Sequence, residues 1–127
     1  MWKTFVLDLC TKIMYTYNME RNKDFVYLAR FMWDTQKNEI NKEGHKVSFE
    51  LASRIFNDPL LYTEYDKENS EEHNEYREKN IGAVDGVLLL TVSTTDVGNK
   101  KRIISARKAE KKEVRIYERN AKTLLGN

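Results

Sequence analysis

Residues 87–113, VLLLTVSTTDVGNKKRIISARKAEKKE, contain the pattern that decides the fold. The run 87–95 is rich in aliphatic and β-branched residues and is typical of a deeply buried strand. Gly98-Asn99 favours a turn, and KRIISA (101–106) is apolar enough to return as a second strand. This stretch therefore predicts two neighbouring strands of an antiparallel sheet.

A basic surface helix is predicted directly after these two strands, from Arg107 to about Leu125, because the segment contains no Gly or Pro. Scattered apolar residues would contact the sheet, and Lys and Arg dominate the remainder. The prediction places Arg107 and Lys108 in the first helical turn, at the positive end of the helix dipole, where cations are disfavoured. A broken local rule of this kind often marks a functional site.

Further strands are predicted before residue 87. LLYTEY (60–65) and YREKNIG (76–82) are strand candidates, and an acidic, turn-rich segment, 66–75, separates them. Asp85-Gly86 is a hairpin signal that joins the second of these strands to the buried one. The four strands together predict a curved antiparallel meander.

The N-terminal half predicts one strand followed by two helices. FVYLARFMW (25–33) is typical of a strand, and Asp34 is placed to cap a helix that runs through Gly44. Ser48 is a second N-cap candidate, and Asn57-Asp58-Pro59 would end the helix that it begins. The predicted fold class is thus α+β: an N-terminal strand and two helices, a curved antiparallel sheet and a C-terminal basic helix.

Length and charge narrow the class of protein further. The chain has 127 residues, enough for one domain with a real core, and Cys10 is its only cysteine, so a reducing, cytoplasmic location is expected. From Lys100 to Lys122 there are ten Lys or Arg against three Glu, whereas the acidic residues concentrate between 58 and 79. This asymmetry favours a polyanionic partner if the fold keeps the two surfaces apart.

Several motifs occur together at fixed spacing. They are WDxxKxxxNxxxH over Trp33–His45, Val47-Ser48-Phe49, FxDP over Phe56–Pro59, Arg77 with Ile81-Gly82, and RIISAR over Arg102–Arg107 with Ala109, Glu113 and Tyr117. Their combination resembles the BrnT toxins of bacterial type II toxin–antitoxin systems. The resemblance covers roughly residues 31–118.

The resemblance to BrnT implies a small RelE-like domain, ribonuclease activity that inhibits translation, and neutralisation by a BrnA-like ribbon-helix-helix antitoxin, which alone would contact operator DNA. We therefore expect a toxin domain at 31–120, a C-terminal tail at 121–127 and an N-terminal extension at 1–30. Either Met19 is the initiator, or the extension adds an amphipathic helix through Phe5, Leu9, Ile13 and Tyr17.

Cleavage of RNA without a metal needs a base for the 2′-hydroxyl proton, cations for the charge at phosphorus, and an acid for the leaving oxygen. His45 is the candidate for proton transfer, because a histidine pKa lies near neutral pH. Arg77, Arg102 and Arg107 are the candidate cations, with Arg102 and Arg107 facing one phosphate at the N-terminus of the last helix. The competing interpretation is that these arginines form salt bridges with the many glutamates.

Other cations would attract or position the RNA. Lys101 and Lys108 add to the positive field, Lys37 would share a helix side with His45, and Tyr117 is a further candidate substrate contact. We expect no cofactor and no metal, because the residues around His73 are typical of a solvated acidic loop.

Two alternatives to a metal-independent ribonuclease remain. The first is a catalytically degenerate toxin homologue that binds RNA, or that serves its antitoxin as a co-repressor partner. The order Gly44-His45-Lys46 and Asp96 in the turn before RIISAR depart from the BrnT pattern and favour this alternative. The second is a metal-dependent nuclease, whose activity EDTA would abolish.

Overall fold

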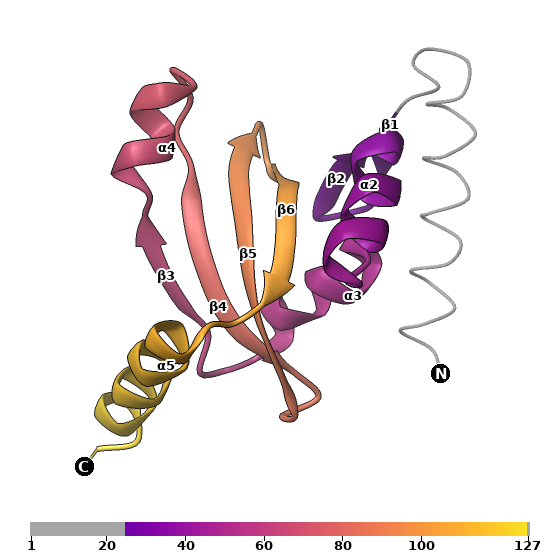
Figure 1. Cartoon of the computed structure of the whole chain (residues 1–127). Coiled ribbons are helices and arrows are strands. Elements are labelled where there is room, and N and C mark those ends of the chain that lie inside the picture. Colours follow the sequence, from indigo (N-terminus) through magenta and orange to yellow (C-terminus); the bar gives the residue numbers. More distant parts are fainter. Residues whose placement is uncertain (1–24, 127) are drawn as a thin grey trace.

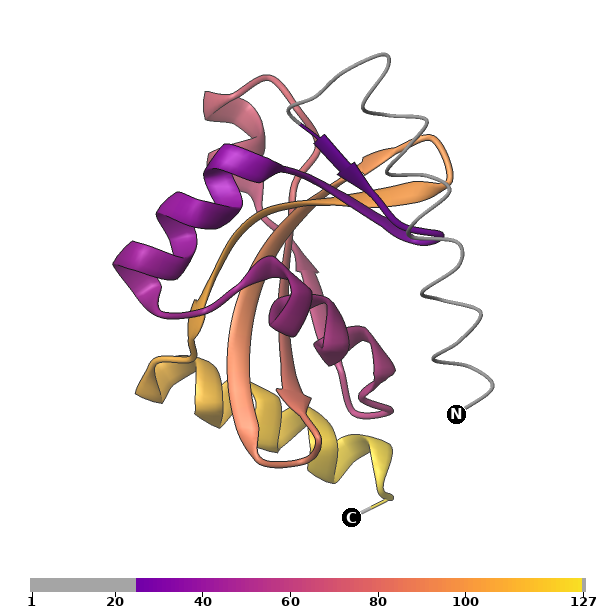
Figure 2. The same cartoon turned by 90° about the vertical axis from the view of Figure 1, so that its right-hand side faces the viewer.

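Residues 25–126 are described by the computed structural model, and they form one six-stranded sheet with helices on both faces (Figures 1 and 2). The strands lie in the order β1-β2-β6-β5-β4-β3. They are β1 (Phe25–Tyr27), β2 (Phe31–Asp34), β3 (Tyr62–Tyr65), β4 (Glu78–Val84), β5 (Leu88–Val97) and β6 (Lys100–Lys108). The helices are α2 (Thr35–His45), α3 (Phe49–Ser53), the 3-10 helix η1 (Arg54–Asn57), α4 (Lys67–Glu72) and α5 (Lys111–Leu124). The predicted α+β class is confirmed, and the expectations for residues 1–24 lie outside the described residues.

The predicted meander is present, because β3, β4, β5 and β6 pair with one another in sequence and antiparallel. Asp85 and Gly86 lie in the three-residue β4–β5 turn (85–87) with φ values of 54° and 72°, positive values that the Asp-Gly pair favours. Glycine is required at Gly82, where an added Cβ would lie 2.9 Å from the Cβ of Ile55. At Gly82, η1 therefore lies directly against β4.

The single strand predicted for 25–33 is wrong, because the chain reverses within it. Residues 28–30 form a turn closed by a 2.7 Å hydrogen bond from the Leu28 amide to the Phe31 carbonyl, so β1 and β2 make an antiparallel hairpin. β2 then pairs parallel to β6, through Phe31 opposite Lys101 and Met32 opposite Arg102. The complete sheet is therefore mixed.

The two predicted N-caps are confirmed. The Asp34 carboxylate accepts from the amides of Gln36 and Lys37, at 2.8 and 3.3 Å, and begins α2. The Ser48 hydroxyl accepts from the Leu51 amide at 3.0 Å and begins α3. Both helices cover one face of the sheet, toward the viewer in Figure 2, and α5 lies behind it.

The core lies between the sheet and these helices. Its fully buried side chains come from both layers. The helical layer contributes Val47, Phe49 and Ile55, and the sheet contributes Trp33 of β2, Leu90 and Val92 of β5, and Ile103 of β6. Burial of one such side chain stabilises the fold by about 1.5–3 kcal/mol.

Asn41 fixes α2 along the edge of β6. Its Nδ2 donates to the carbonyls of Ala106 and Val47, at 2.7 and 2.8 Å, and its Oδ1 accepts from the Ala106 amide at 3.1 Å. The side chain thus pairs with β6 as a neighbouring strand would, beyond the point where β2 ends.

The C-terminal helix begins later than predicted. Arg107 and Lys108 belong to β6, and α5 starts at Lys111. Glu110 and Glu113 form a capping box at its N-terminus, so this helix end carries carboxylates, as the helix dipole prefers. Arg107 and Lys108 are therefore not in the first helical turn, which instead holds Lys111 and Lys112 beside the carboxylate of Glu113.

The segment 66–75 also differs from its prediction, because it contains the short helix α4. Asp66 caps this helix by accepting from the Asn69 amide at 3.2 Å. In Figure 1, α4 lies beyond the ends of β3 and β4, away from α2 and α3.

Candidate functional site

Strand register places Arg102 and Arg107 on the same face of the sheet. Arg102 lies opposite Thr95 and Arg107 opposite Thr91, and these two threonines are four residues apart on β5, so they share a face. Arginines five residues apart would point to opposite faces of a regular strand. A β-bulge between β5 and β6 adds one residue to β6 and restores the shared face.

Arg107 belongs to a cluster around Glu113, a carboxylate with no exposed surface. Its guanidinium donates twice to Glu113, at 2.7 and 2.8 Å, and Lys79 Nζ lies 2.8 Å from the same carboxylate. The hydroxyl of Thr91 donates to it as well, at 2.9 Å. We call Lys79, Thr91, Arg107 and Glu113 the Glu113 cluster.

Protonation of Glu113 is strongly disfavoured in the Glu113 cluster. Burial alone would raise the pKa of Glu113, but the hydrogen bonds from Arg107, the Glu110 amide, Lys79 and Thr91 outweigh it and hold the pKa well below the ordinary value for a glutamate. The cluster therefore contains two cations and one buried anion at neutral pH, and the exposed carboxylate of Glu110, 3.4 Å from Arg107 Nη2, balances the second cation.

A second cluster, of two arginines and one carboxylate, surrounds Glu75. Arg77 Nε and Arg102 Nη2 lie 3.0 and 3.1 Å from its carboxylate. Burial raises the pKa of Glu75, but the hydrogen bond from Arg77 and the charge of Arg102 outweigh it and lower the pKa. We call Arg77, Arg102 and Glu75 the Glu75 cluster.

The Glu75 cluster and the Glu113 cluster lie at separate positions along the strands. Four residues of β5 separate the strand partners of Arg102 and Arg107, which corresponds to about 13 Å. Each guanidinium is also held by its own glutamate. The predicted placement of Arg107 at a helix N-terminus is wrong, and the salt bridges of the competing interpretation are present. The joint contact of both arginines with one phosphate stays a prediction.

A polar cavity of about 410 Å³ extends along this face, and Arg77, Lys79 and Arg107 line it. Ser93 and Ser105, which lie opposite each other on β5 and β6, add hydroxyl groups to its lining. The other wall comes from β3 and α4 and carries the acidic side chains Glu64, Asp66 and Glu68. The fold therefore does not keep the acidic and basic segments apart but places them on two sides of one cavity.

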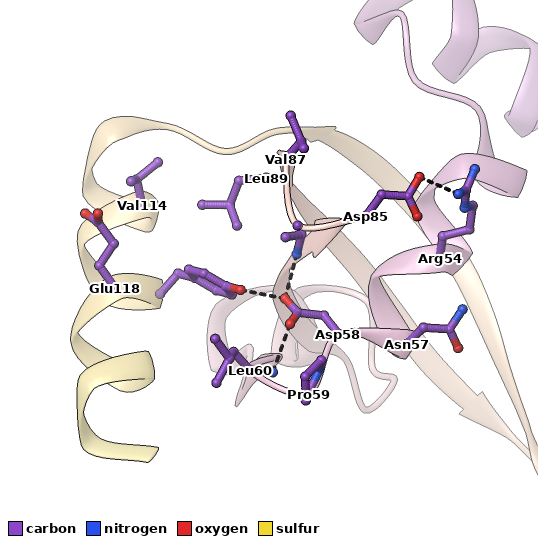
Figure 3. Close-up of a pocket in the computed structure, with 13 residues that line it drawn as sticks. Arg54, Asn57, Asp58, Pro59, Leu60, Asp85, Val87, Leu89, Val114 and Glu118 are labelled. Carbon is purple, nitrogen blue, oxygen red and sulfur yellow. Dashed lines mark hydrogen bonds and ion pairs between the residues drawn. The ribbon is translucent and has the colours of Figure 1, made fainter. Parts of the chain in front are cut away.

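A second cavity, of about 660 Å³, lies between α5, the β4–β5 hairpin and the loop after η1 (Figure 3). Asp58 of the FxDP motif lies in it and accepts from the amides of Leu60 and Ala83 at 2.9 and 2.8 Å. The Tyr117 hydroxyl donates to the same carboxylate at 2.7 Å. Burial and this hydrogen bond raise the pKa of Tyr117 to about 12, so the pair joins α5 to the loop as a neutral phenol and a carboxylate.

The other predicted site residues lie elsewhere. Lys37 and His45 are exposed on α2, on the opposite side of the sheet from α5, and neither lines the polar cavity. Lys101 forms ion pairs with Glu78 and Asp96, at 2.9 and 3.1 Å. Lys108 is exposed at the end of β6.

Within residues 25–126, no hydrogen bond or ion pair joins His45 to any of the three arginines. Its role in proton transfer stays a prediction, as do the roles of Arg77, Arg102 and Arg107 in cleavage and of the other cations and Tyr117 in RNA binding.

Lys79 and Glu64 were missed by the sequence reasoning. The strand period of two gives the available signal, since Arg77, directly before β4, and Lys79 on β4 are two residues apart and so share a face. Among residues 25–126 there is no group of three or more His, Cys, Asp or Glu side chains that could hold a metal ion. Within the same residues, no helix has the length and apolar character needed to cross a membrane.

Comparison with known proteins defines the class as a ribonuclease toxin. The model of the family described as "Ribonuclease toxin, BrnT, of type II toxin-antitoxin system" matches residues 33–113, which is more than half of the chain. The chain belongs to the BrnT toxin family. The crystal structure of the ribonuclease toxin BrnT from Brucella abortus is similar, at 22% identity over 62% of this chain and 94% of that chain, with a TM-score of 0.48. A search among curated proteins found no match.

Proposed function

We propose that this protein is the toxin of a type II toxin–antitoxin pair and cleaves cellular RNA in the cytoplasm without a metal ion, which inhibits translation. The structural observation that supports this proposal is the presence of four cations in two clusters on a single face of the sheet: Arg77, Lys79, Arg102 and Arg107. Phosphodiester groups of a single strand would contact this face, because guanidinium forks match phosphate oxygens.

The reaction that fits such a face is an internal transfer at phosphorus. The RNA 2′-oxygen attacks the adjacent phosphorus as it loses its proton, the bond from phosphorus to the 5′-oxygen breaks, and the leaving oxygen is protonated. The products are a 2′,3′-cyclic phosphate and a 5′-hydroxyl. In this proposal, Arg107 and Lys79 stabilise the charge that develops on the non-bridging oxygens, and removal of one such donor typically slows a reaction about 100- to 1000-fold.

The test uses purified protein, end-labelled RNA and EDTA in the buffer. We expect the wild type to cut RNA and Arg107→Gln to cut it at least about 100-fold more slowly. Arg54→Gln is the matched control, because it removes an exposed arginine whose ion pair with Asp85 lies at the other cavity, and it should retain the wild-type rate. Cleavage that EDTA abolishes would instead support the metal-dependent nuclease.

A catalytically degenerate homologue is the second candidate function. It is favoured by the fact that Arg102 and Arg107 already have carboxylate partners and that His45 does not line the cavity. A folded wild-type protein that binds RNA but leaves it intact, and does not arrest growth when induced, would establish this alternative.

A BrnA-like antitoxin is the partner that we propose for either function. An antitoxin that covers the polar cavity would abolish cleavage and raise the melting temperature of the toxin, because it binds only the folded state. Full nuclease activity in a saturated complex would contradict this mode of inhibition.

A further inference from the structure

The proposed reaction needs a base, and the cavity that holds the cations contains carboxylates but no histidine. Of the acidic side chains in its wall, Asp66 is a poor candidate for the base, because both of its oxygens already accept hydrogen bonds. The amide and the side chain of Asn69 donate them, at 3.2 and 2.8 Å. Glu68 is exposed on α4, the short helix at the rim. Glu64 differs from both, since it is half-buried and lies on β3, a strand of the sheet itself.

Strand register places Glu64 beside the phosphate-binding cations. Its strand partner on β4 is Lys79, and the same row continues to Ser93 and Ser105 on β5 and β6. Neighbouring strands are about 4.8 Å apart, so Glu64 is one strand spacing from Lys79. A phosphodiester that contacts Lys79 and Arg107 would have its sugar over this row, with the carboxylate on its β3 side.

The Glu64 carboxylate is also oriented for proton transfer. The hydroxyl of Tyr62 donates to its Oε2 at 2.9 Å. Among residues 25–126, no cation forms an ion pair with Glu64, so Oε1 is available to a substrate hydroxyl. The hydrogen bond to Glu64 and burial raise the pKa of Tyr62, and the phenol therefore stays a proton donor at neutral pH.

We propose that Glu64 is the general base that removes the RNA 2′-hydroxyl proton, and that Tyr62 is the residue that positions it. The proton moves to Oε1 as the bond from the 2′-oxygen to phosphorus forms and the bond from phosphorus to the 5′-oxygen breaks. Water protonates the leaving oxygen, and Glu64 returns its proton to solvent. This assignment rests on the proposed ribonuclease function and gives the base role to Glu64 in place of His45.

The experiment separates binding from chemistry. Single-turnover cleavage and the Kd for an RNA with a 2′-deoxy linkage at the cut site are measured for the wild type, Glu64→Gln and Tyr62→Phe. We expect Glu64→Gln to slow cleavage about 100- to 10,000-fold, the usual effect of a general base, while the Kd changes less than about threefold. Tyr62→Phe should lose about tenfold in rate and keep its affinity.

Controls distinguish this carboxylate from its neighbours and from the rival base. Glu72→Gln removes an exposed negative charge of α4 outside the cavity, and His45→Ala removes the imidazole, and both should cleave at the wild-type rate. Glu64→Asp keeps a carboxylate and should recover part of the activity, while circular dichroism verifies that each variant is folded.

Three results would overturn the assignment. The first is wild-type cleavage by Glu64→Gln, and the second is a loss in His45→Ala as large as the loss in Glu64→Gln. The third is a parallel loss of RNA affinity and rate in Glu64→Gln, which would make Glu64 a binding residue. A folded wild-type protein that cuts no RNA would overturn the proposed function and this assignment with it.

Discussion

Replacement of Glu113 by glutamine is predicted to destabilise the fold by about 3 kcal/mol. Five donors point at the two oxygens of this carboxylate: two from Arg107, and one each from Lys79, Thr91 and the Glu110 amide. Glutamine keeps one acceptor oxygen but replaces the other with an amide that itself donates. At least two of the five donors would therefore face another donor.

The magnitude follows from the burial of the carboxylate and the partial exposure of its cations. Removing one partner from a buried ion pair costs about 3–5 kcal/mol, because the remaining charge is left uncompensated. The side chains of Lys79 and Arg107 are 26% and 34% exposed, so water restores part of their solvation and the lower end of that range applies. A loss of about 3 kcal/mol lowers the Tm of a domain of this size by roughly 10 °C.

Urea unfolding followed by circular dichroism measures this loss, with Glu118→Gln as the control, because Glu118 is exposed on the same helix and should change stability by less than about 0.5 kcal/mol. The pH dependence has a definite sign. Since the pKa of Glu113 is lower in the folded than in the unfolded state, its contribution is complete at pH 7 and declines as the pH falls below about 5. A difference between wild type and Glu113→Gln of under 1 kcal/mol at pH 7, or one that grows in acid, would refute the reasoning.

Three further substitutions test the fold around the site by the same unfolding assay. Gly82→Ala should cost about 1–3 kcal/mol, since its Cβ would lie 2.9 Å from Ile55, and an unchanged midpoint would show that η1 does not pack there. Asn41→Ala should cost about 2–4 kcal/mol, because the buried amide and carbonyl of Ala106 lose their partner, and a loss below 1 kcal/mol would contradict that role. Tyr117→Phe should cost about 1 kcal/mol and leave the Kd for RNA unchanged, whereas weaker RNA binding would support the predicted substrate contact.

Local signals made the helix starts of the N-terminal half predictable. Asp34 and Ser48 cap through hydrogen bonds to amides two or three residues away, and such contacts depend on neighbouring sequence alone. The Asp85-Gly86 turn is local in the same sense, because both residues adopt the positive φ that this dipeptide favours.

Long-range pairing between strands explains the errors in the predicted sheet and in the predicted start of the C-terminal helix. The parallel contact of β2 with β6 joins Met32 to Arg102, which are far apart in sequence, and no short pattern predicts such a partner. The strand β6 continues through Lys108 because β5 pairs with it that far. The sequence-based boundary ended the strand at Ala106, and Glu110 is not among the residues that usually signal an N-cap.

The candidate site was predictable only in part, for a related reason. The motif identified Arg102 and Arg107, but the bulge that turns both to one face depends on how β6 pairs with β5. Lys79 and Arg107 contact the same carboxylate, that of Glu113, and Glu64 lines the same cavity from β3. Side chains from four strands and two helices contribute to this face, so sequence spacing alone does not group them.

Sequencing of RNA ends after brief induction tests the central claim most directly, that this face of the sheet cuts RNA. The wild-type protein is predicted to create new 5′-hydroxyl ends at reproducible positions, and Arg107→Gln, expressed to the same level and folded, is predicted to create few or none. Identical end profiles in the wild type, Arg107→Gln and uninduced cells would contradict the account.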